Sequence, residues 1–173
     1  MSNLPLGERI ALAERFDFAA PPAVKTSRSE DGTTKNLWKL ADGELIESVL
    51  IPTPSRLTLC ISSQAGCAMA CTFCATGWAG YRRQLSAGEI VAQYRGARAW
   101  ARANGYGEIT NVVFMGMGEP LANLEATMAT VRWLHDPDGF NLSARGITVS
   151  TVGLVPGIRR LAELGLPVTL AVS

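Results

Sequence analysis

From residue 57 onward, short apolar runs alternate with longer segments in which apolar residues recur at helical spacing. Short apolar runs bounded by turn residues predict buried strands, and the helical spacing predicts helices with one apolar face. The predicted strands are residues 57–61, 109–114, 147–151 and 168–172. The predicted helices begin at a Ser86–Glu89 capping box, at residue 121 and at residue 156. Strands and helices that alternate in this way predict a parallel sheet with helices packed on its outside.

This alternation predicts an α/β fold, a partial βα barrel with about three and a half βα units over residues 57–173. The last predicted strand coincides with the end of the chain. A buried strand at that place would leave an unpaired sheet edge. We therefore expect residues 57–173 to be the truncated core of a larger barrel.

The chain before residue 57 has a different pattern. Strand-like runs flank Ala41-Asp42-Gly43, and an Asp-Gly pair between such runs predicts a β-hairpin, so residues 34–56 form a small β lead-in. Residues 1–33 are weakly patterned, with a short amphipathic helix expected over 6–18 and a break at Pro21-Pro22. We expect them to be a tail or the remnant of an accessory domain.

The composition is that of an ordinary globular protein. The 173 residues carry a formal net charge of +1, and 47% of them are hydrophobic. Its net charge therefore does not by itself indicate binding to nucleic acid or to a membrane. No signal peptide or membrane-spanning run is recognisable, so the expected location is the cytoplasm, with no membrane partner. In that reducing compartment, clustered cysteines indicate metal or redox chemistry rather than disulfides.

All four cysteines lie in the stretch CISSQAGCAMACTFCATG, which begins at Cys60. Cys67, Cys71 and Cys74 share one loop, so their sulfurs can converge on a single zinc ion or iron–sulfur cluster. A structural zinc site needs four ligands, whereas three cysteines on a four-iron cluster leave one iron open for a substrate. Cys60 is a candidate fourth ligand, but it lies in the predicted strand. The arrangement therefore fits three ligands and one separate thiol better.

Phe73 completes a Cys-x3-Cys-x-aromatic-Cys pattern, which is that of radical S-adenosylmethionine enzymes. Three further stretches lie in collinear order with it: DGTTKNLWKLADGELIESVLIP, NVVFMGMGEPLANL and ITVSTVGLVPGIRRLAELGLPVTLAVS. Over roughly residues 30–173, the chain thus resembles the RlmN/Cfr family of radical enzymes, which methylate adenine in RNA. The resemblance implies a [4Fe-4S] cluster on Cys67, Cys71 and Cys74, with S-adenosylmethionine as second cofactor.

The resemblance also implies a reaction. Carbon 2 of adenine is electron-poor and a weak nucleophile, so the family uses a radical made from S-adenosylmethionine at the cluster. That radical takes hydrogen from a methyl group carried on a cysteine near the C-terminus, and the resulting carbon radical adds to the adenine. Cys60 matches the family's second catalytic cysteine, and Glu47 matches the glutamate proposed to remove the ring proton. The positions that match cofactor contacts are Gly118, Glu119, Ser150 and Ser173.

The sequence departs from the family at one point, because no cysteine follows Cys74. The methyl-carrying cysteine is absent, and we expect the chain to be unable to complete methyl transfer alone. The RlmN branch acts on carbon 2 in 23S ribosomal RNA, and many members also act on tRNA. One alternative is the Cfr branch, which methylates carbon 8. Another is a catalytically silent cluster-binding or zinc-binding fragment.

The partners implied by the resemblance are 23S rRNA, tRNA and an external electron donor of the flavodoxin type. A second chain is a candidate source of the missing C-terminal half. Side chains that could contact RNA phosphates, or form an ordinary solvated surface, are Arg82, Arg83, Arg95, Arg98 and Arg102. Trp38 and Tyr81 are candidates for stacking on an unpaired base.

Overall fold

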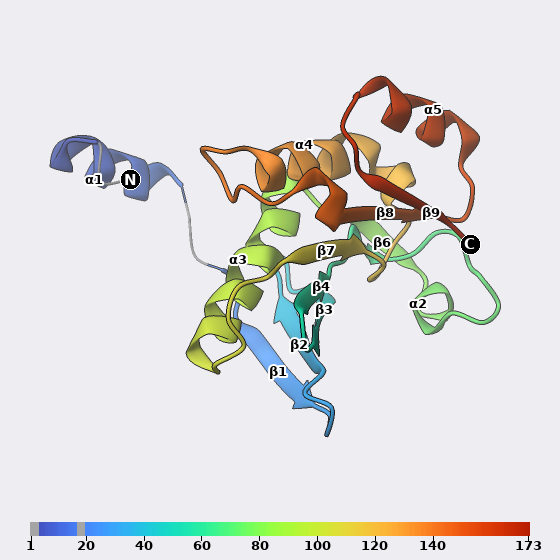
Figure 1. The fold of residues 1–173 in the computed structure, drawn as a ribbon, viewed down its shortest axis with the longest axis horizontal. Helices are drawn as coiled ribbons and strands as arrows, with labels where there is room; N and C mark the ends of the chain where they lie inside the picture. The colour runs from blue at the N-terminus through green and yellow to red at the C-terminus, as the bar shows by residue number, and fades with distance from the viewer. Residues whose placement is uncertain (1–3, 17–19) are drawn as a thin grey trace.

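A seven-stranded sheet forms the framework of the protein (Figure 1). The computed structural model describes residues 4–16 and 20–173. Along the sheet the strand order is β1-β2-β3-β4-β7-β8-β9. These strands are β1 (Ala23–Arg28), β2 (Thr34–Lys39), β3 (Leu45–Thr53), β4 (Arg56–Cys60), β7 (Asn111–Phe114), β8 (Ile147–Thr151) and β9 (Thr169–Val172).

The sheet changes character at β4. Strands β1 to β4 are antiparallel neighbours, whereas β4, β7, β8 and β9 pair in parallel. The parallel half and its helices confirm the predicted α/β fold with βα units. The Asp-Gly hairpin is also confirmed, since β2 and β3 pair continuously from Thr34–Leu50 to Lys39–Leu45.

Strand β1 was not predicted from the sequence. It lies in the segment expected to be a tail, and it pairs with β2 at the edge of the sheet. All six of its side chains are exposed, so it lacks the alternation of apolar and polar residues that indicates a half-buried strand. Before it, helix α1 (Leu6–Arg15) ends earlier than expected and has no buried residue. Positions 17 and 18 of the expected helix lie outside the described residues.

Helices α3 (Ala87–Ala103) and α4 (Leu124–His135) cover one face of the sheet and contact each other. The capping box is formed as predicted: Ser86 Oγ accepts a hydrogen bond from the Glu89 N–H, and the Glu89 carboxylate accepts one from the Ser86 N–H. A 3₁₀ turn, η1 (Pro120–Asn123), precedes α4, and η2 (Ala144–Gly146) precedes β8. Helix α5 (Val155–Glu163) connects β8 to β9.

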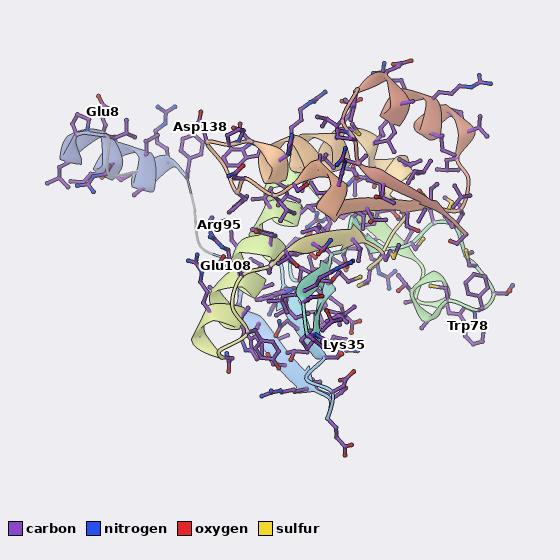
Figure 2. All side chains as sticks on the ribbon, in the orientation of Figure 1. Glu8, Lys35, Trp78, Arg95, Glu108 and Asp138 are labelled. Carbon is purple, nitrogen blue, oxygen red and sulfur yellow. The ribbon has the colours of Figure 1, made fainter. Side chains whose placement is uncertain are left out.

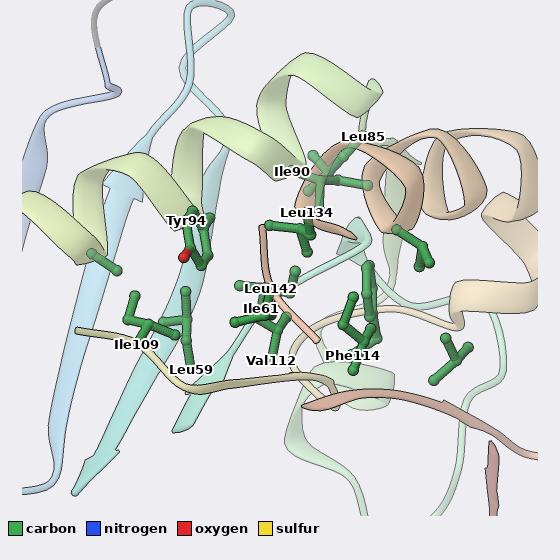
Figure 3. Close-up of a cluster of buried hydrophobic side chains, with 14 of the residues drawn as sticks. Leu59, Ile61, Leu85, Ile90, Tyr94, Ile109, Val112, Phe114, Leu134 and Leu142 are labelled. Carbon is green, nitrogen blue, oxygen red and sulfur yellow. The ribbon is translucent and has the colours of Figure 1, made fainter. Parts of the chain in front are cut away.

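The hydrophobic core lies between the sheet and these helices (Figure 3). Alternate strand residues supply its floor, and they are Leu57, Leu59, Ile61, Val112, Phe114, Ile147 and Val149. Ile90, Tyr94 and Leu134 from the helices close it from above. Because strand side chains alternate between faces, the intervening residues point to the opposite side of the sheet. In the described part of the chain, no helix is long and apolar enough to cross a membrane.

Candidate functional site

The three clustered cysteines are carried by a small hairpin that branches from the sheet. Its strands are β5 (Gln64–Gly66) and β6 (Tyr81–Gln84), and the one-turn helix α2 (Ala75–Trp78) lies between them. Gly66 forms the neck of this hairpin at φ +76°, and a Cβ there would lie 1.9 Å from the Gly80 carbonyl oxygen. Only glycine fits at this position, and the close approach of the two strands makes residues 67–80 a closed loop.

The donor set of this loop fits an iron–sulfur cluster. Burial raises the pKa of the Cys67 thiol, and the charges of Cys74 and Cys71 raise it further. Thiolates that repel one another in this way are stabilised by a metal cation between them. Among the described residues, no three His, Cys, Asp or Glu side chains are already assembled at metal-binding distance.

Cys60 lies apart from this loop, at the end of β4. It pairs with Val49 of β3 on one side and with Val113 of β7 on the other. Burial raises the pKa of its thiol to about 11, while the backbone N–H of Met115 donates to the sulfur and partly offsets that rise. None of the loop cysteines is among the groups that shift its pKa. This supports the interpretation of Cys60 as a separate thiol.

Glu47 shares a sheet face with Cys60. Residues opposite each other in an antiparallel pair point to the same side, and Val49, the partner of Cys60, lies two positions after Glu47. Glu47 is therefore a diagonal neighbour of Cys60, about 7 Å away between Cα atoms. Its carboxylate pairs with Lys35 of β2 at 3.0 Å. We call the sheet face of Glu47, Val49, Cys60, Val113 and Ser150 the site face.

The loop after β7 lies directly beside the end of β4. A Cβ on Gly116 would lie 2.7 Å from the Ile61 carbonyl, and one on Gly118, at φ +100°, would lie 2.5 Å from Gln64 Cβ. The Glu119 side chain is buried, and its carboxylate accepts hydrogen bonds from the N–H groups of Leu121 and Val152, each at 2.9 Å. This carboxylate also contributes to the raised pKa of Cys67, so it lies near the cysteine loop.

Ser150 and Ser173 come from the last two strands. Val113 pairs with Thr148 in the parallel ladder, which places Ser150 on the site face near the carboxyl end of β8. Ser173 follows β9, and its N–H donates to the Thr151 carbonyl at 3.1 Å. Cys60, Gly118, Ser150 and Ser173 thus lie at or just after the carboxyl ends of β4, β7, β8 and β9, where βα folds place their sites. Glu47 lies in the antiparallel strand β3, and the three loop cysteines lie in the separate hairpin.

One expectation about RNA contacts is wrong. Trp38 is only 3% exposed, and its indole N–H donates to Ser48 Oγ inside the core, so its ring cannot stack on a base. Side chains alternate along β2, and Trp38 falls on the face that packs into the core. The sequence alone did not indicate which face of this strand would be buried. Tyr81 is 42% exposed, and the unpredicted Trp78 is 78% exposed on α2 (Figure 2).

The expected arginines fall into two groups. Arg83 bridges Asp42 and Glu89, and Arg98 and Arg102 both pair with Glu108. These three arginines are therefore engaged in ion pairs within the chain, although Arg98 and Arg102 share the single carboxylate of Glu108. Among the described residues, no ion pair is formed by Arg82 or Arg95.

Sequence analysis missed a set of side-chain amides and a hydroxyl that hold the segment after β4. Gln93 of α3 donates to the Ser62 carbonyl and accepts from its N–H, while Asn123 donates to the Ser63 carbonyl. Ser62 Oγ in turn accepts from the Met117 N–H and donates to the Glu47 carbonyl. The sequence did contain a signal for this network. Three polar residues, Ser62-Ser63-Gln64, directly follow a buried strand, and buried polar side chains need hydrogen-bond partners.

A cysteine loop at the carboxyl end of the first parallel strand of a βα sheet defines a class of cluster-binding proteins. The chain belongs to the Radical SAM superfamily, whose family model matches residues 61–173. Its full length is 54% identical to the "Probable dual-specificity RNA methyltransferase RlmN" of Nocardioides sp., of which it covers 48%. The protein of the same name from Bifidobacterium adolescentis is 53% identical over 99% of this chain and 46% of its own length.

A solved structure gives the same picture. The crystal structure of a radical SAM methyltransferase from Sphaerobacter thermophilus matches with a TM-score of 0.92 and 49% identity, over 99% of this chain and 50% of that one. These similarities confirm the resemblance to the RlmN family and the radical SAM fold. The chain spans about half the length of the curated relatives it matches.

Proposed function

We propose that this chain is the part of an RNA methyltransferase that binds the cluster and S-adenosylmethionine, in an enzyme acting on carbon 2 of adenine in 23S rRNA and tRNA. One observation carries the proposal: Glu47 and Cys60 are diagonal neighbours on the site face, and the hairpin that carries the other three cysteines begins at Gln64, soon after Cys60 in the chain. A zinc-binding or merely structural role for that hairpin would give no reason for a carboxylate and a second thiol together on the site face. The names of the relatives support RNA as the substrate class.

The residues have distinct roles in this proposal. Cys67, Cys71 and Cys74 hold the [4Fe-4S] cluster, which when bound supplies the electron that cleaves S-adenosylmethionine. The loop at Gly118 and Glu119, together with Ser150 and Ser173, would hold S-adenosylmethionine and orient it for that reaction. These groups bind and aim the cofactor rather than react.

Glu47 and Cys60 act on the RNA side of the site. Glu47 would accept the proton that leaves carbon 2, and Lys35 holds its carboxylate in place through the 3.0 Å ion pair. Cys60, as a thiolate, would attack the sulfur of the methyl-carrying cysteine, so that a disulfide forms as the bond from that sulfur to the methylene carbon breaks. The carbon would keep the electron pair and take up a proton, which releases the methylated RNA. No cysteine follows Cys74 in the 173 residues, so that partner must come from a further segment or a second chain. An external electron donor of the flavodoxin type is also required.

Anaerobic reconstitution with iron and sulfide tests the cofactor assignment. The protein should turn brown and hold about four irons per chain, and it should bind S-adenosylmethionine. A colourless protein with one zinc would contradict the proposal and favour the zinc-binding alternative.

Nucleoside analysis of RNA tests the substrate assignment. The reconstituted chain, supplied with the C-terminal half of a relative, is incubated with 23S rRNA and tRNA and a reduced flavodoxin. We expect 2-methyladenosine by mass spectrometry, and none without the added half. 8-Methyladenosine would instead place the chain in the Cfr branch.

A further inference from the structure

We propose that Gln64 is a positioning residue that sets the cysteine loop against the loop that meets S-adenosylmethionine. The inference deepens the proposed function and rests on it. Gln64 begins β5, three residues before Cys67, at the neck of the cysteine hairpin. A small displacement there would move all three cysteines together.

Both polar atoms of the Gln64 side chain form hydrogen bonds within the protein. The residue is 1% exposed. Its Oε1 accepts a hydrogen bond from the Glu119 N–H at 2.9 Å, and its Nε2 donates to Gln84 Oε1 at 2.8 Å. An amide with a partner on each end has one allowed orientation, because a flip would oppose donor to donor and acceptor to acceptor. The side chain therefore fixes β5 relative to Glu119.

The hydrogen bonds continue beyond Gln64 in both directions. On one side, the Glu119 carboxylate accepts a hydrogen bond from the N–H of Val152, which lies just after β8. At the other end, Gln84 Nε2 donates to the Ala122 carbonyl in η1. A single hydrogen-bonded chain, Gln84–Gln64–Glu119–Val152, thus joins the cysteine hairpin, the loop after β7 and the end of β8. These are the segments that would meet the cluster, the amino group and the remainder of S-adenosylmethionine.

Steric contact reinforces this chain. A Cβ on Gly118 would lie 2.5 Å from Gln64 Cβ and 2.6 Å from Gln64 Cγ. The glutamine side chain therefore lies in van der Waals contact with the backbone of the cofactor loop, and glycine at 118 makes that contact possible. An apolar residue at 64 would keep most of the contact but lose the hydrogen bonds, which separates the two effects.

The test compares Gln64→Leu with a matched control, Ser48→Ala. Ser48 accepts a buried hydrogen bond from Trp38 on the core face, so its removal also costs a buried contact but leaves the cofactor loops alone. Each variant is reconstituted, its iron content and thermal midpoint are measured, and S-adenosylmethionine is titrated. Binding is followed by equilibrium dialysis and by the change in the electron paramagnetic resonance spectrum of the reduced cluster.

We expect Gln64→Leu to keep its iron and its spectrum without S-adenosylmethionine, but to bind the cofactor about 10-fold more weakly, as losses of outer-shell partners do. Its spectral response to the cofactor should also shrink. Ser48→Ala should match the wild type in its affinity for S-adenosylmethionine and in its spectral response to the cofactor. Equal affinity in the two variants would overturn the role of Gln64, whereas a wild-type chain without cluster or cofactor binding would overturn the proposed function itself.

Gln84→Leu keeps the proposal testable if Gln64→Leu does not fold. Gln84 is exposed, so the substitution is mild, yet it removes the partner of Gln64 Nε2 and the bond to Ala122. A weaker affinity with unchanged iron content would support the chain of hydrogen bonds. An unchanged affinity would contradict it.

Discussion

Lys35 and Glu47 form an ion pair between neighbouring strands, with 3.0 Å between Nζ and Oε1. Their side chains are 50% and 39% exposed, so water screens the attraction. An exposed pair of this kind contributes little to folding. The pair lies beside Cys60 on the site face, and in the proposed function it holds the Glu47 carboxylate in place.

Lys35→Met should therefore change stability very little. We expect the free energy of unfolding to fall by less than about 1 kcal/mol, the usual range for exposed ion pairs. Ser48→Ala, one residue from Glu47 but on the core face, should cost about 1–3 kcal/mol because it leaves the buried Trp38 N–H unpaired. Urea unfolding of both variants checks the difference. Equal losses would show that the ion pair has a structural role.

The Cys60 thiol should be almost inert at neutral pH. Its pKa of about 11 lies above the ordinary value of 9.0, so at pH 8 the thiolate fraction is lower by about 100-fold. Alkylation by iodoacetamide should be correspondingly slow in the native protein and fast in urea. The rate of Cys60 alkylation in the native protein should rise about tenfold per pH unit toward pH 11. Mass spectrometry of the Cys60 peptide measures each rate.

The same pKa difference affects stability. The folded state holds the Cys60 proton more tightly than the unfolded state, so this contribution is fully present below pH 9 and is lost between pH 9 and about 11. Cys60→Ala should remove that part of the alkaline decline in stability. If the variant lost stability over this interval as steeply as the wild type, the buried thiol would not be its source.

The parallel half of the sheet and the placing of three cysteines in one loop could be predicted from the sequence for physical reasons. Buried strands and amphipathic helices have distinct periods, and the spacing of Cys67, Cys71 and Cys74 lies within one loop. Strand β1 was not readable, because an exposed edge strand carries no hydrophobic alternation. Nor was the role of Gln64, because its partners Glu119 and Gln84 become neighbours only through tertiary folding.

Gly118→Ala should be much more harmful than Gly105→Ala. Both glycines have positive φ, at +100° and +77°, so each substitution carries a backbone cost of about 1–2 kcal/mol. At Gly105 nothing lies within 4 Å of the added methyl, whereas at Gly118 it would overlap Gln64. We expect an extra loss of about 1–3 kcal/mol from that overlap, together with weakened binding of S-adenosylmethionine. Similar thermal midpoints for the two variants would contradict the close packing of the loops.

Cys74→Ala and Cys60→Ala should separate the two kinds of cysteine. Cys74 lies in the hairpin loop, and its charge acts on Cys67, so its removal would take away one of the three proposed cluster ligands. We expect the reconstituted variant to lose its iron and its brown colour.

Cys60 is buried in β4 between Val49 and Val113, and the loop cysteines leave its pKa unaffected. Cys60→Ala should therefore retain about four irons per chain, with an unchanged visible spectrum. Loss of iron from Cys60→Ala would make Cys60 a ligand, and the division of the four thiols into three ligands and one catalytic group would be wrong.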